Sequence, residues 1–183
     1  MPVSIEPASE IPDVLVVKTG VFHDARGFFS ESWSKHMWLK AGFDAEFVQD
    51  NLSRSAKGTL RGLHYQNHPQ GMGKLVRCIQ GAVFDVAVDL RKASPTFGKW
   101  VGRELSGENQ LSLWVPVGFA HGFVALEDNT LVHYKCTGHH APECEQALLY
   151  KCPEVNIAWP MEPTIISEKD AVAPVLSKAI FNF

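Results

Sequence analysis

Three short stretches of the sequence carry side chains that could move a proton at neutral pH. His64 lies in the stretch Arg-Gly-Leu-His-Tyr-Gln at residues 61–66, Lys74 begins the stretch Lys-Leu-Val-Arg, and His121 lies within residues 116–123. None of the three has a second metal-ligating side chain beside it. An imidazole titrates near neutral pH, whereas a lysine ammonium stays charged and offsets a developing negative charge. These residue types predict acid–base catalysis through an anionic intermediate rather than a metal centre.

The segments that must position these side chains have the pattern of β-strands. Short runs rich in β-branched and aromatic residues alternate with Gly, Pro, Asn and Asp, which predicts a sandwich or jelly roll. Helical patterns are confined to residues 34–41, before Gly42, and to residues 168–173, after the N-cap residue Ser167. The predicted strands are residues 14–17, 75–79, 83–90, 111–115, 122–126 and 131–135.

Length and composition predict one cytoplasmic domain over residues 1–183. The 183 residues are 45% apolar, enough for one filled core, and no linker or repeat divides them. Seventeen Lys and Arg against twenty Asp and Glu give a net charge of −3, so the charge indicates neither nucleic acid nor a membrane as partner. The start of the chain has no signal-peptide pattern, and the apolar runs are shorter than a membrane span.

The cysteines are widely spaced and form no C-x-x-C pair, so reduced and mostly buried thiols are expected. A zinc site among the last three of them, completed by nearby histidines, is an alternative that this spacing disfavours. The cysteines are Cys78, Cys136, Cys144 and Cys152, and the nearby histidines are His133, His139 and His140.

The stretch Pro116-x-Gly118-x-x-His121 resembles half of the second signature of the cupin jelly rolls, in which a tight turn leads a histidine into the barrel. The H-x-H pair with a following glutamate, which would supply the other metal ligands, occurs nowhere in the sequence. The motif predicts an all-β, cupin-like jelly-roll barrel or sandwich with a few short helices, and no metal or cofactor is expected in it.

A collinear series of motifs closely resembles the dTDP-4-dehydrorhamnose 3,5-epimerases, from about Gly20 to Pro174. These are metal-free, cupin-like isomerases of deoxysugar nucleotide biosynthesis. The resemblance implies epimerisation at C3 and C5 of dTDP-4-dehydro-6-deoxy-D-glucose, which gives dTDP-4-dehydro-L-rhamnose for surface polysaccharide. The motifs are residues 26–31, 49–51, 60–66, 73–77, 85–91, 94–98, 114–123, 134–137 and 167–170.

The resemblance implies a role for four side chains in catalysis. Inversion beside a ketone needs a base, a cation that stabilises the enolate, and an acid that protonates the opposite face. His64 matches the base, and Asp170 matches the carboxylate that fixes its tautomer. Lys74 matches the cation facing the C4 ketone, and Tyr134 matches the proton donor.

The resemblance also implies a set of substrate-binding residues and one departure from the family. The family usually carries an aromatic pair, one ring of which stacks on thymine, where this sequence has Gly138-His139-His140. Histidine can stack but offers less area, which affects the expected selectivity for the base. The implied substrate-binding residues are Arg26, Phe28, Glu31, Gln49, Asn51, Arg61, Lys74, His121, His140, Glu145 and Lys169.

Strand alternation adds two expectations. Arg61 and His64 fall on opposite faces of a regular strand, so they can share a pocket only if Gly62 bends or bulges it. Alternation also turns Arg77 away from Lys74, which indicates a structural or interface role for Arg77.

Family members are homodimers that exchange strands near the N-terminus, so a homodimer with strand exchange is expected here. Two alternatives stay open at this stage. One is an epimerase that acts at a single carbon or on another 4-ketosugar nucleotide. The other is a cupin-type metal dioxygenase or a catalytically silent sugar-binding barrel, against which stand the missing H-x-H pair and the intact catalytic set.

Overall fold

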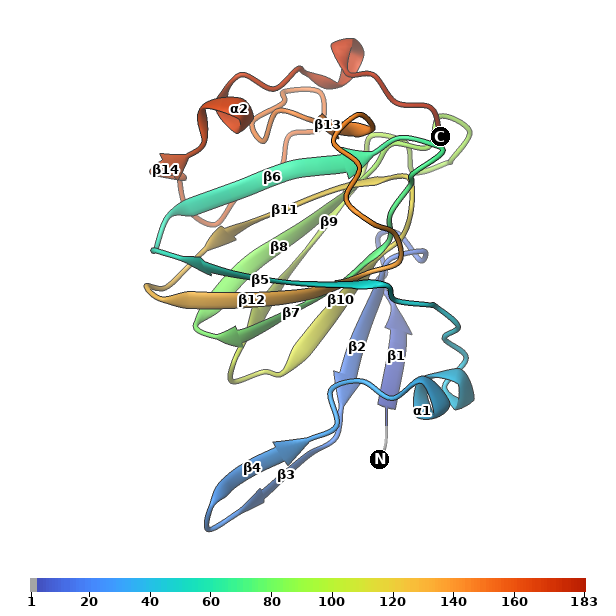
Figure 1. Ribbon diagram of the computed structural model, residues 1–183. Helices are drawn as coiled ribbons and strands as arrows, with labels where there is room; N and C mark the ends of the chain where they lie inside the picture. Colours follow the sequence, from blue (N-terminus) through green and yellow to red (C-terminus); the bar gives the residue numbers. More distant parts are fainter. Residues whose placement is uncertain (1–2) are drawn as a thin grey trace.

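The strand-like runs of the sequence form two facing β-sheets and a separate hairpin in the computed structural model, which describes residues 3–183 (Figure 1). The first sheet has the order β1 (Val3–Pro7), β2 (Leu15–Thr19), β10 (Leu111–Val115), β7 (Lys74–Gln80), β12 (Thr130–Cys136) and β5 (Gln49–Ser55). The second has the order β13 (Glu145–Ala147), β6 (Thr59–Gln66), β11 (Phe119–Ala125), β8 (Ala82–Asp89) and β9 (Trp100–Ser106), with β14 (Ile165–Ile166) also paired to β6. The hairpin consists of β3 (Val21–Asp24) and β4 (Gly27–Ser30). The expected all-β jelly roll is confirmed.

The core lies between the sheets because alternate residues of each strand point to the same face. Val76 and Val132 from the first sheet pack with Ala87, Phe119 and Phe123 from the second in one buried cluster. The edge strand β5 and its counterpart β6 turn polar side chains inward instead, and they border an open cavity between the two sheets.

Two further clusters cover the outer faces of the sheets. The C-terminal segment packs over the second sheet, where Phe181 joins Leu63 and Val88, and it runs along β6 in Figure 1. This packing holds α2 (Glu168–Ala171) beside β6. On the first sheet, Trp38 of α1 (Lys35–Lys40) packs with Leu75. The C-terminal segment therefore delivers α2 to the edge of the cavity.

The predicted strands and helices are present, with shifted ends. The first helix was predicted over residues 34–41, and α1 spans Lys35–Lys40 with Ser34 as its N-cap residue. The second helix was predicted to extend to residue 173, but α2 ends at Ala171. Pro174 disfavours helical geometry in the residue before it, which explains the early end. A short 3₁₀ helix follows at Leu176–Lys178. Within residues 3–183, no helix has the length and apolar composition to cross a membrane.

The bulge expected at Gly62 is confirmed by the register of β6 against β11. His121 pairs with His64, whereas Phe123 pairs with Arg61, so a three-residue step on β6 faces a two-residue step on β11. Gly62 has φ of +124°, and a Cβ there would lie 2.6 Å from the Cα of Gly122. Only glycine suits such a backbone conformation and such a close approach. The bulge lets Arg61 and His64 line the same cavity.

Candidate active site

A cavity of about 510 Å³ opens between β5 and β6. It adjoins a second cavity of about 360 Å³, and the two share His64, Lys74 and Tyr134 in their walls. All four predicted catalytic side chains line the larger cavity, together with two further residues from the predicted substrate-binding set, which also includes Lys74. These six residues are His64, Lys74, Tyr134, Asp170, Arg61 and His121.

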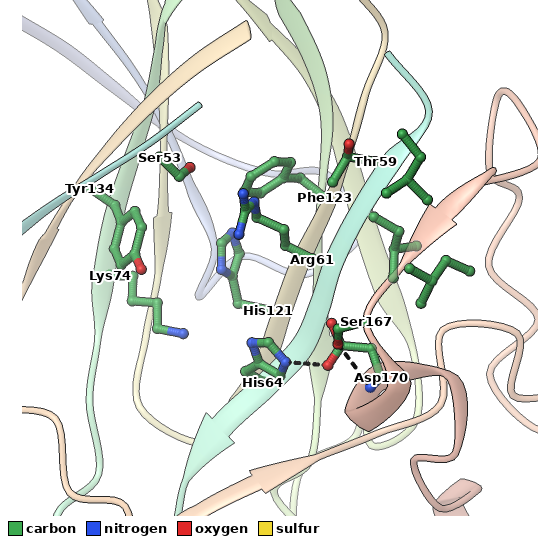
Figure 2. Close-up of a pocket in the computed structure, with 13 residues that line it drawn as sticks. Ser53, Thr59, Arg61, His64, Lys74, His121, Phe123, Tyr134, Ser167 and Asp170 are labelled. Atoms are coloured by element: carbon green, nitrogen blue, oxygen red, sulfur yellow. Dashed lines mark hydrogen bonds and ion pairs between the residues drawn. The ribbon is translucent and has the colours of Figure 1, made fainter. Parts of the chain in front are cut away.

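His64 is paired with a buried carboxylate (Figure 2). Nε2 of His64 lies 2.6 Å from Oδ1 of Asp170, and Asp170 is only 3% exposed. The N–H of Gly62 donates to Oδ2 of Asp170, and the N–H of Asp170 donates to Oγ of the N-cap Ser167. Burial alone would raise the pKa of Asp170, but its bonds from His64 and Gly62 hold that pKa below the usual value. The ionised carboxylate accepts from Nε2–H, which leaves Nδ1 of His64 as the basic nitrogen.

A second imidazole and carboxylate form a similar pair deeper in the second sheet. Nε2 of His121 lies 2.8 Å from Oδ1 of Asp85, and both side chains are buried. Oδ2 of Asp85 is buried without a hydrogen-bond partner among residues 3–183. The sequence reasoning gave Asp85 no role, although a carboxylate within the apolar strand β8 was a signal that could have found it.

Lys74 and Tyr134 come from the first sheet and face the two histidines across the cavity (Figure 2). Burial lowers the pKa of the Lys74 ammonium, and the nearby Cys136 and Asp85 groups oppose part of that shift. Burial raises the pKa of the Tyr134 phenol, which therefore keeps its proton at neutral pH. One sheet thus carries a cation and a proton donor, and the other carries two imidazoles.

Arg61 connects the strands that border the opening. Its Nε donates to Oγ of Ser55 at 3.1 Å, and its terminal nitrogen donates to the carbonyl of Arg54 at 3.1 Å. Ser53 and Phe123 complete this part of the wall and were not among the predicted residues. The guanidinium is suited to gripping an anionic group that enters between the sheets.

Besides Lys74, the smaller cavity gathers four predicted binding residues, and one more, Lys169, lies beside it. Gln49, Asn51, His140 and Glu145 line it. Glu145 accepts from Lys169 at 2.8 Å and lies 3.0 Å from Nε2 of His140. Burial alone would raise the pKa of Glu145, but these two partners hold it below the usual value. This end of the site therefore combines amides, an imidazole and a charged pair.

Three predicted binding residues lie away from the cavities of this chain. Arg26 is on the hairpin of β3 and β4, which projects from the sheets in Figure 1, and it pairs with Asp24. Phe28 borders hollows on the outer side of the first sheet, and Glu31 follows the end of β4. Arg77 also lines that outer side and contacts Gln110, which confirms that it points away from Lys74.

The alternative zinc site finds no support in the arrangement of side chains. Among residues 3–183, no three His, Cys, Asp or Glu side chains gather in a way that could hold a metal ion. All four cysteines are free thiols, and Cys144 is the least buried of them.

Comparisons with known proteins agree on one family. The model of the dTDP-4-dehydrorhamnose 3,5-epimerase family matches residues 8–178. A dTDP-4-dehydrorhamnose 3,5-epimerase of Shigella flexneri is 53% identical over 163 residues, which covers 88% of this chain and 90% of the relative. One from Salmonella typhimurium is 49% identical over 174 residues, covering 94% and 95%.

Solved structures show the same fold. A Legionella pneumophila dTDP-6-deoxy-D-glucose-3,5-epimerase in complex with dTDP-4-keto-L-rhamnose matches with a TM-score of 0.92 and 45% identity, covering 97% of this chain and 94% of that one. A 3′-monoepimerase of Streptomyces bikiniensis in complex with dTDP-quinovose matches with a TM-score of 0.87 and 32% identity, covering 94% and 87%.

Proposed function

The chain belongs to the dTDP-4-dehydrorhamnose 3,5-epimerase family, and we propose that it converts dTDP-4-dehydro-6-deoxy-D-glucose to dTDP-4-dehydro-L-rhamnose. The observation that carries this proposal is one cavity with the pair His64–Asp170 on one wall and Lys74 and Tyr134 on the other. A base and an acid on opposite walls suit the inversion of a carbon placed between them.

His64 is the proposed base. The protons on C3 and C5 are acidic because both carbons adjoin the C4 ketone. Nδ1 of His64 takes the proton from the sugar carbon. The electron pair of the broken C–H bond forms a double bond to C4, and the π electrons of the ketone move onto its oxygen, which gives the enolate. Asp170 is the proposed positioning residue, because its carboxylate holds the ring and stabilises the imidazolium that forms.

Lys74 and Tyr134 are the proposed partners of the enolate. The Lys74 ammonium offsets the charge on the enolate oxygen in a site where burial strengthens the interaction. The Tyr134 phenol then delivers its proton to the ring carbon from the face opposite His64, and the electron pair of the enolate forms the new C–H bond. Solvent returns the proton to Tyr134 and removes the one on His64. The sequence of steps balances without an oxidant, a reductant or a cofactor.

The remaining polar residues are proposed to hold the nucleotide diphosphate. Arg61 and His121 lie in the cavity with the reacting groups, where they suit the sugar and the adjoining phosphate. Gln49 and Asn51 line the adjoining cavity and suit the diphosphate and the base. His140, Glu145 and Lys169 lie at the same end, with His140 in the place of the usual stacking ring.

We also propose that the protein acts as a homodimer with exchanged N-terminal strands. The hairpin exposes three large aromatic side chains, Phe22 at 49%, Phe28 at 57% and Phe29 at 64%. An apolar cluster of this kind on a projecting hairpin is typical of an interface. Arg26, Phe28 and Glu31 would then bind substrate in the partner's cavity.

Product analysis tests the proposed function. Chelator-treated protein is incubated with dTDP-4-dehydro-6-deoxy-D-glucose, and the configurations at C3 and C5 are followed by NMR. Inversion at both carbons is expected, and an unchanged substrate would overturn the proposal. Inversion at one carbon would favour the second candidate, a single-carbon epimerase, to which the similarity with the 3′-monoepimerase points.

A further inference from the structure

The thiol of Cys136 lies between the predicted nucleotide contacts and the predicted catalytic lysine. Strand β12 runs between β5 and β7, and Cys136 pairs with Gln49 on one side and with Lys74 on the other. The three side chains form one row across the inner face of the sheet, where directly opposed side chains come into contact. Cys136 is fully buried.

A line of hydrogen bonds ends on this thiol. The backbone N–H of His140 donates to Oε1 of Gln49 at 3.1 Å. Nε2 of Gln49 donates to Oδ1 of Asn51 at 3.1 Å, and Nδ2 of Asn51 donates to Sγ of Cys136 at 3.4 Å. The line joins the loop after β12 to the thiol beside Lys74.

The direction of this line is fixed at its His140 end. A backbone N–H can only donate, so the oxygen of the Gln49 amide must face it and the NH₂ group must face Asn51. The same reasoning places the Asn51 oxygen toward Gln49 and its NH₂ group toward Cys136. The sulfur is therefore the acceptor that terminates the line.

An NH₂ group has two N–H donors, so each amide has a second N–H group that takes no part in this line of hydrogen bonds. Gln49 and Asn51 both line the smaller cavity. Two spare donors at one wall match a ligand whose oxygens only accept, and a diphosphate is such a ligand.

We propose that Cys136 is a positioning residue, whose sulfur anchors the Asn51 amide, and through it the Gln49 amide, in the position from which their free N–H groups donate to the diphosphate of the substrate. This inference rests on the proposed function, because it takes the ligand to be a nucleoside diphosphate sugar. The thiol acts through the amides and does not contact the substrate.

The test compares two substitutions that separate hydrogen bonding from volume. Cys136→Val keeps an apolar side chain of similar size but has no acceptor, whereas Cys136→Ser keeps an acceptor and loses volume. Calorimetry measures the Kd of dTDP for each. We expect Cys136→Val to weaken dTDP binding by about 3- to 10-fold and Cys136→Ser to bind within about 2-fold of wild type. Cys136→Ala provides a second acceptor-free variant should valine not be accommodated.

Two controls complete the experiment. Cys78 is also a buried thiol, but its sulfur contacts the carbonyls of Gln80 and Gly81, so Cys78→Val should leave the Kd of dTDP unchanged. In an Asn51→Ala background, Cys136→Val should cause no further loss, because the bond between them is already gone.

Two results would overturn the inference. The first is dTDP affinity retained in Cys136→Val and lost in Cys136→Ser, which would show that the thiol only fills space. The second is the same loss from Cys136→Val with and without Asn51→Ala. Failure of the wild-type protein to bind dTDP would instead overturn the proposed function.

Discussion

The chemistry at the residue scale depends on which nitrogen of His64 is basic. The buried Asp170 carboxylate engages Nε2, so Nδ1 carries the lone pair. We expect Asp170→Asn to lower kcat by roughly 10²-fold or more with little change in KM, because the amide cannot stabilise the imidazolium. NMR time courses measure the rate. Thermal unfolding is the control, since asparagine can still accept from the Gly62 N–H. An unchanged kcat in the folded variant would refute the role of the pair.

We expect deprotonation of Lys74 to cause the fall of kcat/KM at alkaline pH. Burial holds the pKa of this ammonium below its ordinary value of 10.5. A rise in pH through that lowered pKa removes the cation, so kcat/KM should fall at a pH below 10.5. Lys74→Arg should lower the neutral rate by about 10²-fold through displaced charge, yet remove the alkaline decline because arginine stays charged. The test is to measure kcat/KM against pH in overlapping buffers for the wild type and for Lys74→Arg. The same alkaline decline in both proteins would show that another group causes it.

At the element scale, the bulge in β6 depends on Gly62. Gly62 and Gly27 have nearly the same φ, +124° and +122°, but a Cβ at Gly62 would meet the β11 backbone. At Gly27, apart from the glycine and its two chain neighbours, no heavy atom of residues 3–183 lies within 4 Å of such a Cβ. We expect Gly62→Ala to lower the free energy of unfolding by roughly 2 kcal/mol or more beyond the loss in Gly27→Ala. Urea denaturation measures both, and equal losses would show that backbone conformation alone is responsible.

Strands with buried apolar runs could be predicted from the sequence, including β7, β11 and β12, which carry site residues, whereas β5 could not. β8 and β10 have apolar runs whose pattern indicates a strand. β5 has no such pattern, because Gln49, Asn51 and Ser53 line the cavities while the alternate residues face outward. A strand that is polar on both faces loses the hydrophobic periodicity that sequence reasoning depends on.

The site itself was only partly accessible from sequence. His64 and Asp170 lie 106 residues apart, so spacing could not pair them, and only the resemblance to a family did. The hydrogen bond between His121 and Asp85 was missed because the local sequence of a strand does not reveal which strand it pairs with or in which register. Arg26 and Phe28 lie away from both cavities, so the binding role proposed for them depends on the proposed homodimer.

At the scale of the whole molecule, the hairpin of β3 and β4 makes the assembly testable. We expect the wild-type protein to sediment as a dimer and Phe29→Ser to shift it toward monomer, because Phe29 is the most exposed aromatic of the hairpin. The variant should also bind dTDP more weakly, since Arg26 would no longer reach a partner's cavity. Analytical ultracentrifugation and calorimetry measure the two effects.

Val172→Ser is the matched control, because Val172 is 82% exposed and lies after α2, outside the hairpin. It should leave both the sedimentation and the affinity unchanged. A monomeric wild-type protein with full activity would remove the need for a second subunit. A single domain over residues 1–183 and a cytoplasmic location stay predictions, and residues 1 and 2 lie outside the described residues.

The most direct test of the account is the number of deuterons that the substrate gains in D₂O. Wild-type protein and His64→Ala are each incubated with dTDP-4-dehydro-6-deoxy-D-glucose, and NMR reads the hydrogen content at C3 and C5. The account predicts exchange at both carbons in the wild type and a loss of exchange at both in the variant, since one base serves both positions. Exchange that survives in His64→Ala at the wild-type rate would contradict it.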